Sequence, residues 1–357
     1  MIPDRIEKIR NALPDGTAAL ITNEADCFYF SGFLRSEGMV LITKTGATLY
    51  VDFRYIEAAK AACKGNIAVK LTYAFLKDIA ADLKAEDVKT VFIQSEYVTL
   101  SLKAKMEKAF EGAQVSTELE LDKIIGDMRA VKDKNEISLI KAAQEITDSG
   151  FTYIKEKITA GRTEREVALD LEFFMRKNGS EGTAFDTICV SGKNSSKPHG
   201  VPGEKVIEKG DFVTLDFGAM KGGYRSDMTR TVCVGAPTEK MKLVYNTVLK
   251  AQNEALRVIK PGMVCTDIDK VARDIINAAG FEGKFGHGLG HSVGIDIHEN
   301  PSFNTRCRAL TKPGMVITVE PGIYLENEFG VRIEDMIIVT ENGCENITKS
   351  EKELIIL

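Results

Sequence analysis

Four acidic residues interrupt apolar runs that otherwise favour β-strands. Asp216 and Asp227 flank a glycine-containing turn at residues 218–223, and Glu320 and Glu334 repeat this arrangement further along the chain. Acids on solvent-facing edge hairpins are one interpretation. If the four carboxylates converge instead, each like-charge pair at ~4 Å costs about 4 kcal/mol at an effective dielectric near ~20, so protons or cations must offset the repulsion. Two divalent cations would do so, as in two-metal hydrolytic sites.

Histidines gather in one short segment after the first acidic pair. Three of the four, His287, His291 and His298, lie between residues 287 and 298. The spacing of the first two fits helical metal ligands, but the interleaved glycines disfavour a helix and indicate close backbone approach. The fourth, His199, lies in a loop before the first hairpin. One histidine with four carboxylates forms an oxygen-rich ligand set, which favours Mn²⁺, Co²⁺ or Fe²⁺ over a sulfur-bound zinc.

The elements that must position these residues occur twice in the same order. A helix from Asp133 and another over about 163–177 precede strands in 185–235, and helices over about 238–259 and 266–279 precede a second block of strands. We therefore expect a duplicated helix-helix-strand-strand unit folded about a pseudo-twofold axis. Such an axis would bring the two acidic pairs together.

Short motifs support this duplication. Gly210–Gly218 aligns with Gly314–Gly322, each an apolar strand with one acid before a glycine turn, and Tyr224–Asp227 aligns with Val331–Glu334. Ahead of the duplicated part, residues 1–126 alternate strand and helix patterns, which predicts a small α/β domain. The second domain is expected at 127–357, and its first helix carries a capping-box pattern. The predicted class is α/β (α+β).

Composition excludes several classes of protein. The chain has 357 residues, 44% of them hydrophobic and 28% charged, with a net charge of -5, which is typical of a globular protein and excludes a disordered one. No basic block suggests nucleic acid as a partner, and no apolar stretch reaches the ~18–20 residues of a membrane span. The seven cysteines form no C-x-x-C pair, so a disulfide framework and a thiolate zinc site are not expected. We expect a cytoplasmic protein.

The motifs around these residues resemble those of the pita-bread metallopeptidases, which include methionine aminopeptidase, aminopeptidase P and prolidase. The resemblance lies in T-L-D-F-G, R-S-D-M-T-R, G-H-G-L-G-H, V-E-P-G-I-Y and V-R-I-E-D. Cys27–Phe33 and Val51–Tyr55 look like the creatinase/prolidase-type N-terminal domain, which methionine aminopeptidases lack. The resemblance thus favours an Xaa-Pro dipeptidase or aminopeptidase. A methionine-aminopeptidase-like enzyme and a non-catalytic binding protein on the same fold are the alternatives.

The resemblance implies two divalent metal ions, with Mn²⁺ the expected metal and Co²⁺, Fe²⁺ or Zn²⁺ possible. Asp216 would hold one ion, His291 and Glu320 the other, and Asp227 and Glu334 would bridge both. A hydroxide bridging the ions would attack the scissile carbonyl, and Glu320 would pass its proton. The remaining site residues would contact the peptide or orient the acids: His199 and His298 at the oxyanion, His287, Phe185 and Ile297 around the substrate, and Arg332 beside the acids.

One position departs from the family pattern. Many proline-specific members carry an arginine directly after H-E-x-P, where it binds a substrate carboxylate, but this chain has Ser302 there. Arg306 and Arg308 lie nearby and are candidates to replace it. The implied substrate is a peptide with proline after its N-terminal residue, and the choice between dipeptides and longer peptides stays open. The family also implies a homodimer.

Overall fold

The computed structural model describes residues 2–34 and 37–357. The chain forms two compact units, Met1–Arg129 and Ala130–Leu357. The break lies close to the boundary predicted after residue 126. The assignment of the two parts as separate functional domains stays a prediction.

The first unit is built on a six-stranded mixed sheet with the strand order β4-β3-β2-β1-β5-β6. The β1–β5, β5–β6 and β3–β4 pairs are parallel, and β2 is antiparallel to both of its neighbours. The strands are β1 (Thr17–Ile21), β2 (Met39–Thr43), β3 (Ala47–Val51), β4 (Ala68–Leu71), β5 (Thr90–Ile93) and β6 (Gln114–Ser116). The helices are α1 (Ile2–Ala12), α2 (Glu24–Ser31), α3 (Ile56–Cys63), α4 (Phe75–Ala85), α5 (Leu100–Ala109) and α6 (Leu121–Ala130).

The second unit begins with two helices whose starts are fixed by local hydrogen bonds. Asp133 caps α7 (Lys134–Lys155) and Thr163 caps α8 (Glu164–Lys177), and each makes the reciprocal bonds of a capping box. A three-stranded sheet in the order β11-β8-β7 follows. Its strands are β7 (Ile188–Ser191), β8 (Phe212–Phe217) and β11 (Met228–Cys233), with the 3₁₀ helix η1 (Gly192–Ser196) after β7.

The second half repeats this order. Helices α9 (Glu239–Val258) and α10 (Cys265–Ala278) precede a five-stranded sheet in the order β13-β12-β14-β17-β18. Its strands are β12 (Gly290–Ser292), β13 (Glu299–Phe303), β14 (Val316–Val319), β17 (Asp335–Val339) and β18 (Cys344–Asn346). A separate pair joins β15 (Gly322–Leu325) to β16 (Phe329–Arg332).

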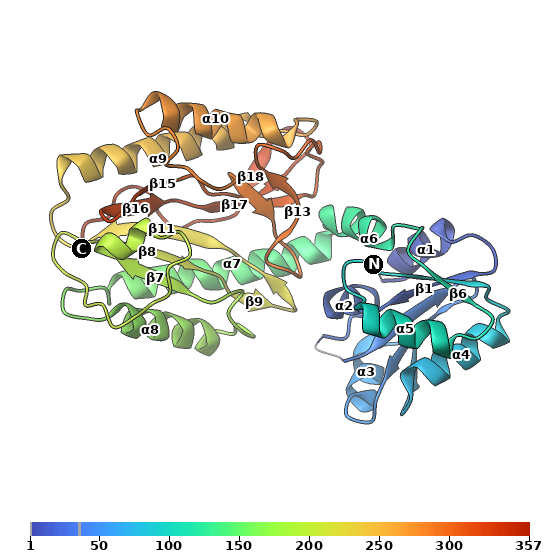
Figure 1. Cartoon of the computed structure of the whole chain (residues 1–357). Helices are drawn as coiled ribbons and strands as arrows, with labels where there is room; N and C mark the ends of the chain where they lie inside the picture. The colour runs from blue at the N-terminus through green and yellow to red at the C-terminus, as the bar shows by residue number, and fades with distance from the viewer. Residues whose placement is uncertain (1, 35–36) are drawn as a thin grey trace. The chain divides into compact units, whose positions relative to one another are not determined.

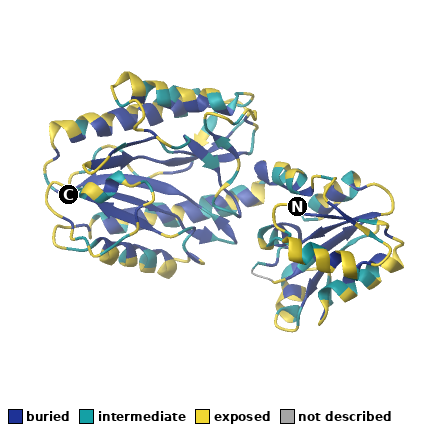
Figure 2. Ribbon diagram, viewed as in Figure 1, coloured by how far each residue is buried: buried dark blue, intermediate teal, exposed yellow. Residues whose placement is uncertain are grey.

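The two halves meet along their strands. The Glu334 N–H donates to the carbonyl of Thr229 at 3.1 Å, and the Thr231 hydroxyl donates to the carbonyl of Arg332 at 3.0 Å. In the second unit, α7 and α8 cover one side of the strands and α9 and α10 cover the other (Figure 1). Strands β7, β8, β11, β14 and β17 are buried along their whole length, whereas the helices expose their outer faces (Figure 2). The predicted fold class and the duplicated pita-bread arrangement are confirmed.

One detail of the predicted hairpins is wrong, and it recurs in the second half. Residues 218–223 do not form one turn, because β9 (Met220–Lys221) and β10 (Tyr224–Arg225) pair as a small sheet of their own. Gly218 makes this departure possible, since a Cβ there would lie 1.9 Å from the Ser226 carbonyl oxygen. In the second half, β14 pairs with β17 while β15 pairs with β16, so the acids lie where the strands change partners.

All seven cysteines are free thiols. No helix within the described ranges combines the length and the apolar character that crossing a membrane requires.

Candidate metal centre

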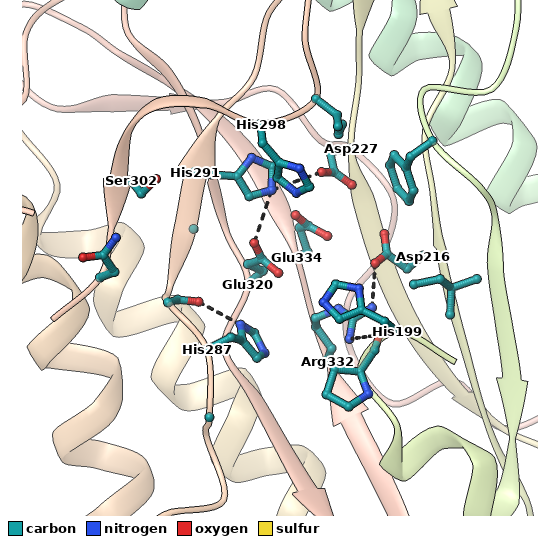
Figure 3. Close-up of a pocket in the computed structure, with 18 of the residues that line it drawn as sticks. His199, Asp216, Asp227, His287, His291, His298, Ser302, Glu320, Arg332 and Glu334 are labelled. Atoms are coloured by element: carbon teal, nitrogen blue, oxygen red, sulfur yellow. Dashed lines mark hydrogen bonds and ion pairs between the residues drawn. The ribbon is translucent and has the colours of Figure 1, made fainter. Parts of the chain in front are cut away.

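Strand ends position the four acids. Asp216 lies on β8 and pairs with Thr229, while Asp227 directly precedes β11. Glu320 directly follows β14 and Glu334 directly precedes β17, so these two face each other across the β14–β17 pair. The junction of the two halves therefore carries acids from both (Figure 3).

His291 lies in the middle of β12, opposite Ser302 on β13. The predicted close backbone approach occurs at Gly290, where a Cβ would lie 1.9 Å from the Thr318 carbonyl oxygen, and at Gly288, where it would lie 2.8 Å from that of Phe303. It does not occur at Gly286, whose surroundings are open. Two of the three glycines thus let β12 pack tightly enough to bring His291 to the acids.

The imidazole and the acids form one compact group. Single ligand atoms of Asp227, His291 and Glu334 all lie within 4.8 Å of one another. His291 Nε2 is 3.5 Å from Asp227 Oδ2 and 3.5 Å from Glu320 Oε1. Asp216 lies on the same cavity wall and is tied to Arg332. This donor set, carboxylate oxygens with one imidazole nitrogen, suits a hard divalent cation.

Burial and mutual repulsion shift Asp227, Glu320 and Glu334 toward their protonated forms when no cation is bound. Burial raises the pKa of Glu320 to about 8, with a further contribution from Asp216. Burial also raises the pKa of Asp227 well above its ordinary value, as does the nearby Glu334. The pKa of Glu334 is likewise raised by burial and by Glu320. For His291, burial lowers the pKa to about 4, so the ring is a neutral donor at neutral pH.

Three carboxylate oxygens at this site have no protein partner. Asp216 Oδ1, Asp227 Oδ1 and Glu334 Oε1 are buried, and none accepts a hydrogen bond from the described part of the chain. Buried polar atoms are normally satisfied, because an unmet acceptor costs about 1–3 kcal/mol. These unmet oxygens lie beside a neutral imidazole, so the residues present fit a cation-binding role.

Arg332 links the acids to the rest of the site. Its Nη2 lies 2.6 Å from Asp216 Oδ2, and its Nε donates to the Thr229 hydroxyl at 3.0 Å, which in turn donates to Glu334 Oε2 at 2.7 Å. Its Nη1 donates to the Tyr324 hydroxyl at 2.9 Å. One buried guanidinium thereby sets the orientation of acids from both halves of the unit.

A cavity of about 820 Å³ opens onto these groups. Its lining contains every site residue predicted from the sequence: Phe185, His199, Asp216, Asp227, His287, His291, Ile297, His298, Glu320, Arg332 and Glu334. Of the two arginines considered as replacements at the Ser302 position, Arg306 lines the cavity and Arg308 is not among the lining residues. Figure 3 shows the acids, His291, His298 and Ser302 around the hollow. The role of each side chain stays a prediction.

Comparison with known proteins agrees with this geometry. Residues 138–341 match metallopeptidase family M24, and residues 5–131 match the creatinase/prolidase N-terminal domain. The chain belongs to metallopeptidase family M24. It is 40% identical to the Xaa-Pro dipeptidase of Pyrococcus furiosus, over 99% of both chains.

Solved structures give the same result for this M24 chain. An Xaa-Pro dipeptidase from Bacillus anthracis matches with a TM-score of 0.95 and 40% identity over 100% of both chains. An X-Pro aminopeptidase from Thermotoga maritima matches with a TM-score of 0.91 and 37% identity, over 99% of this chain and 100% of the other. The protein is therefore a metal-dependent peptidase.

Sequence reasoning missed two residues of this M24 site. Thr229 joins Arg332 to Glu334, and Tyr324 lies between Arg332 and His287, with its hydroxyl 2.9 Å from His287 Nε2. Both belong to motifs that the sequence displays, D-M-T-R and V-E-P-G-I-Y. Their presence there was the available signal, but the contacts of Thr229 depend on how strands of the two halves meet, and those of Tyr324 on how the β15–β16 pair lies against the His287 segment.

Proposed function

We propose that this M24 metallopeptidase hydrolyses the Xaa-Pro bond of dipeptides or short peptides, with two divalent cations at the carboxylate cluster. The observation that carries the proposal is the set of partnerless buried oxygens on Asp216, Asp227 and Glu334 beside the neutral His291, at the end of a peptide-sized cavity. The printed activities of the relatives from P. furiosus and B. anthracis support the Xaa-Pro assignment.

Under this proposal Asp216, Asp227, His291, Glu320 and Glu334 hold the cations, and Mn²⁺ is the expected metal because the ligands are mostly oxygens. Divalent cations held here would supply an activated water at neutral pH and a Lewis acid for the scissile carbonyl. The Thr318 hydroxyl donates to Glu320 Oε1 at 3.2 Å and fixes this carboxylate beside His291. Glu320 is proposed to accept and return the proton of the attacking water.

The imidazoles of His298 and His199 line the same cavity and would contact the peptide. Burial lowers the pKa of His298, and its ring packs edge-on against that of His291, with centroids 4.4 Å apart. A neutral ring presents an N–H that donates to a developing oxyanion. His199 comes from the opposite half of the unit and would donate from the other side. Phe185 and Ile297 supply apolar surface for the proline ring.

Arg306, rather than Arg308, is proposed to bind the carboxylate of a substrate that ends in proline. The cavity is lined by three arginines, Arg273, Arg306 and Arg332. Arg273 is bound to Asp269, and Arg332 to Asp216. The guanidinium of Arg306 is exposed at the cavity and makes no ion pair among the described residues, so it is available to an incoming anion.

A kinetic panel tests the proposal. The purified enzyme, stripped of metal and restored in turn with Mn²⁺, Co²⁺ and Zn²⁺, would be assayed on Ala-Pro, Ala-Pro-Ala and Met-Ala peptides. Hydrolysis of Ala-Pro peptides that is lost in D227A is the expected result. Cleavage of Met-Ala peptides without cleavage of Ala-Pro peptides would contradict the Xaa-Pro assignment. Full activity of D227A would contradict the metal mechanism.

The same panel separates the two candidate activities. A preference for Ala-Pro indicates a dipeptidase, whereas a preference for Ala-Pro-Ala favours X-Pro aminopeptidase activity, the printed function of the T. maritima relative. We also propose a cytoplasmic homodimer on the basis of the family resemblance. Light scattering coupled to size-exclusion chromatography tests the oligomeric state.

A further inference from the structure

A buried carboxylate outside the metal centre lies at the start of α8. Glu164 has no exposed surface. Its Oε1 accepts hydrogen bonds from the backbone N–H of Ser191 at 2.7 Å, from the Ser191 hydroxyl at 3.0 Å and from Asn194 Nδ2 at 3.2 Å. Its Oε2 accepts hydrogen bonds from the N–H of Gly203 at 3.3 Å and from Asn194 Nδ2 at 3.4 Å. Several donors that converge on one carboxyl group hold it in a fixed orientation.

These donors are the two ends of one loop. Ser191 and Asn194 precede His199, and Gly203 follows it. The middle of the loop, His199–Pro202, lines the metal-centre cavity. Backbone bonds reinforce the closure, since the Arg165 N–H donates to the carbonyl of Gly203 at 3.1 Å. Glu164 therefore closes the loop at its base, and the position of His199 over the cavity depends on that closure.

The second half of the unit holds its own histidine loop in a similar way. Asp269 on α10 is also fully buried, and its Oδ1 accepts from the Leu289 N–H at 3.0 Å. Both of its oxygens bind Arg273, which donates to the carbonyls of Phe285 at 2.7 Å and His287 at 2.8 Å. In each half, a buried carboxylate on the second helix fastens the loop that carries a cavity histidine.

We propose that Glu164 is a positioning residue that acts through His199, and that Asp269 with Arg273 holds His287 in the corresponding way. The inference rests on the proposed function to the extent that His199 contacts the peptide. Within the described part of the chain, Glu164 contacts none of the five proposed metal ligands. Its loss should therefore change turnover without changing metal binding.

The first experiment compares E164Q with E166Q in the full-length, metal-loaded enzyme. Glu166 is a matched control because it belongs to the same first turn, is exposed and, among the described residues, forms hydrogen bonds outside the helix only with the half-buried cap residue Thr163. E164Q is expected to lower kcat/KM by about 10- to 100-fold, since small misplacements of a catalytic group cost that much. The Mn²⁺ affinity of E164Q and all parameters of E166Q should stay within about two-fold of wild type. Wild-type turnover in E164Q overturns the proposal.

A double-mutant cycle then separates positioning from general folding. In an H199A background, E164Q should lower kcat/KM by no more than about two-fold, because a residue that acts through His199 has nothing left to position. An equal loss in both backgrounds overturns the proposal. The cycle uses whichever peptide the wild-type enzyme cleaves. Cleavage of non-proline peptides alone would overturn the proposed function and leave this test intact.

Hydrogen exchange gives a readout that does not depend on activity. The amides of residues 191–203 should exchange about 10-fold faster in E164Q than in E166Q, since loop opening sets the exchange rate. Unchanged exchange contradicts the proposal. If E164Q unfolds, N194A removes a single donor to Glu164, and the same cycle with H199A is applied to it. If N194A lowers turnover by the same factor in the H199A background as in the wild-type background, the proposal is contradicted.

Discussion

Arg332 Nη2 lies 2.6 Å from Asp216 Oδ2, and both side chains are buried. This ion pair occupies one oxygen of Asp216 and leaves Oδ1 without a partner among the described residues. The positive charge of Arg332 also lowers the pKa values of Asp227, Glu320 and Glu334, against the effect of their burial. The Arg332 guanidinium thus orients Asp216 and limits how far the pKa values of the other three acids are raised.

Replacing Arg332 with methionine should weaken metal binding. Loss of the charge raises the pKa values of the acids further, so protons compete better with the cation, and loss of the donors frees Asp216 to rotate. We expect Mn²⁺ affinity to fall by about 10- to 100-fold, the range for partners of metal ligands. Isothermal titration calorimetry at pH 7 measures this effect. R308M is the control, since Arg308 is exposed and is not among the residues that line the cavity. Unchanged affinity in R332M would show that the ion pair does not tune the site.

Substitution of Arg306 should discriminate between substrates with and without a free carboxylate. R306A is expected to raise the KM for Ala-Pro by about 10-fold or more, because a hydrogen bond to a charged group contributes about 1.5–3 kcal/mol. The KM for Ala-Pro amide and the kcat for both peptides should change little. R308A supplies the matched control. A similar rise in KM on both peptides would mean that Arg306 acts on the shape of the cavity rather than on the carboxylate.

Metal binding should release protons. Because the pKa of Glu320 is raised to about 8, its carboxyl is mostly protonated at pH 7 in the metal-free protein, and the raised pKa values of Asp227 and Glu334 act in the same direction. A cation displaces these protons, so its apparent affinity should increase as the pH rises from 6 to 8. Calorimetric titrations in buffers of different ionisation enthalpy count the protons. E320Q should release fewer, and an equal release would contradict this account of the site.

Local patterns allowed much of this architecture to be predicted. Asp133 with Glu136 displays a capping box within four residues of sequence, and α7 begins there. The hydrophobic periodicity of the sequence also predicted most of the helices and strands. Helices α2, α5 and α6 were not predicted; α5, for example, buries Met106 alone, so its apolar pattern is weak. The apolar run around Glu334 is divided between β16 and β17.

The candidate site was likewise predictable from the sequence only in part. The acids and histidines stand in short motifs, so the sequence reveals them as candidates. The contact of Thr229 to Arg332 joins strands from different halves of the unit, whereas Tyr324 and Arg332 lie on the two strands of the β15–β16 pair. The Thr229 contact depends on how β11 and β16 meet, and no local pattern encodes that. The sequence could therefore name the reactive groups, but the network that orients them needed the three-dimensional structure.

His287 should make the protein sensitive to acid. Its Nδ1 lies 2.8 Å from the Gly288 carbonyl oxygen, which only accepts, so Nδ1 carries the proton and Nε2 accepts from the Tyr324 hydroxyl. Burial, with a contribution from Arg332, lowers the pKa of His287 to about 4. Below pH ~6.5 the imidazole of His287 becomes protonated in the unfolded chain but stays neutral in the folded protein. The folding stability that is fully present above pH ~6.5 is therefore lost progressively as the pH falls to ~4.

The loss attributable to His287 is about 3 kcal/mol of unfolding free energy, at 1.36 kcal/mol for each unit of pKa difference. Urea unfolding of metal-free wild type and H287Q at pH 7.5, 5.5 and 4.5 measures it. The variant should be less stable than wild type at pH 7.5 but should lose less stability between pH 6.5 and 4. His291, whose pKa is also lowered to about 4, contributes its own share equally to both proteins. Parallel pH profiles for the two proteins would show that His287 accepts a proton in the folded state, and the hydrogen-bond direction assigned to Tyr324 would then be wrong.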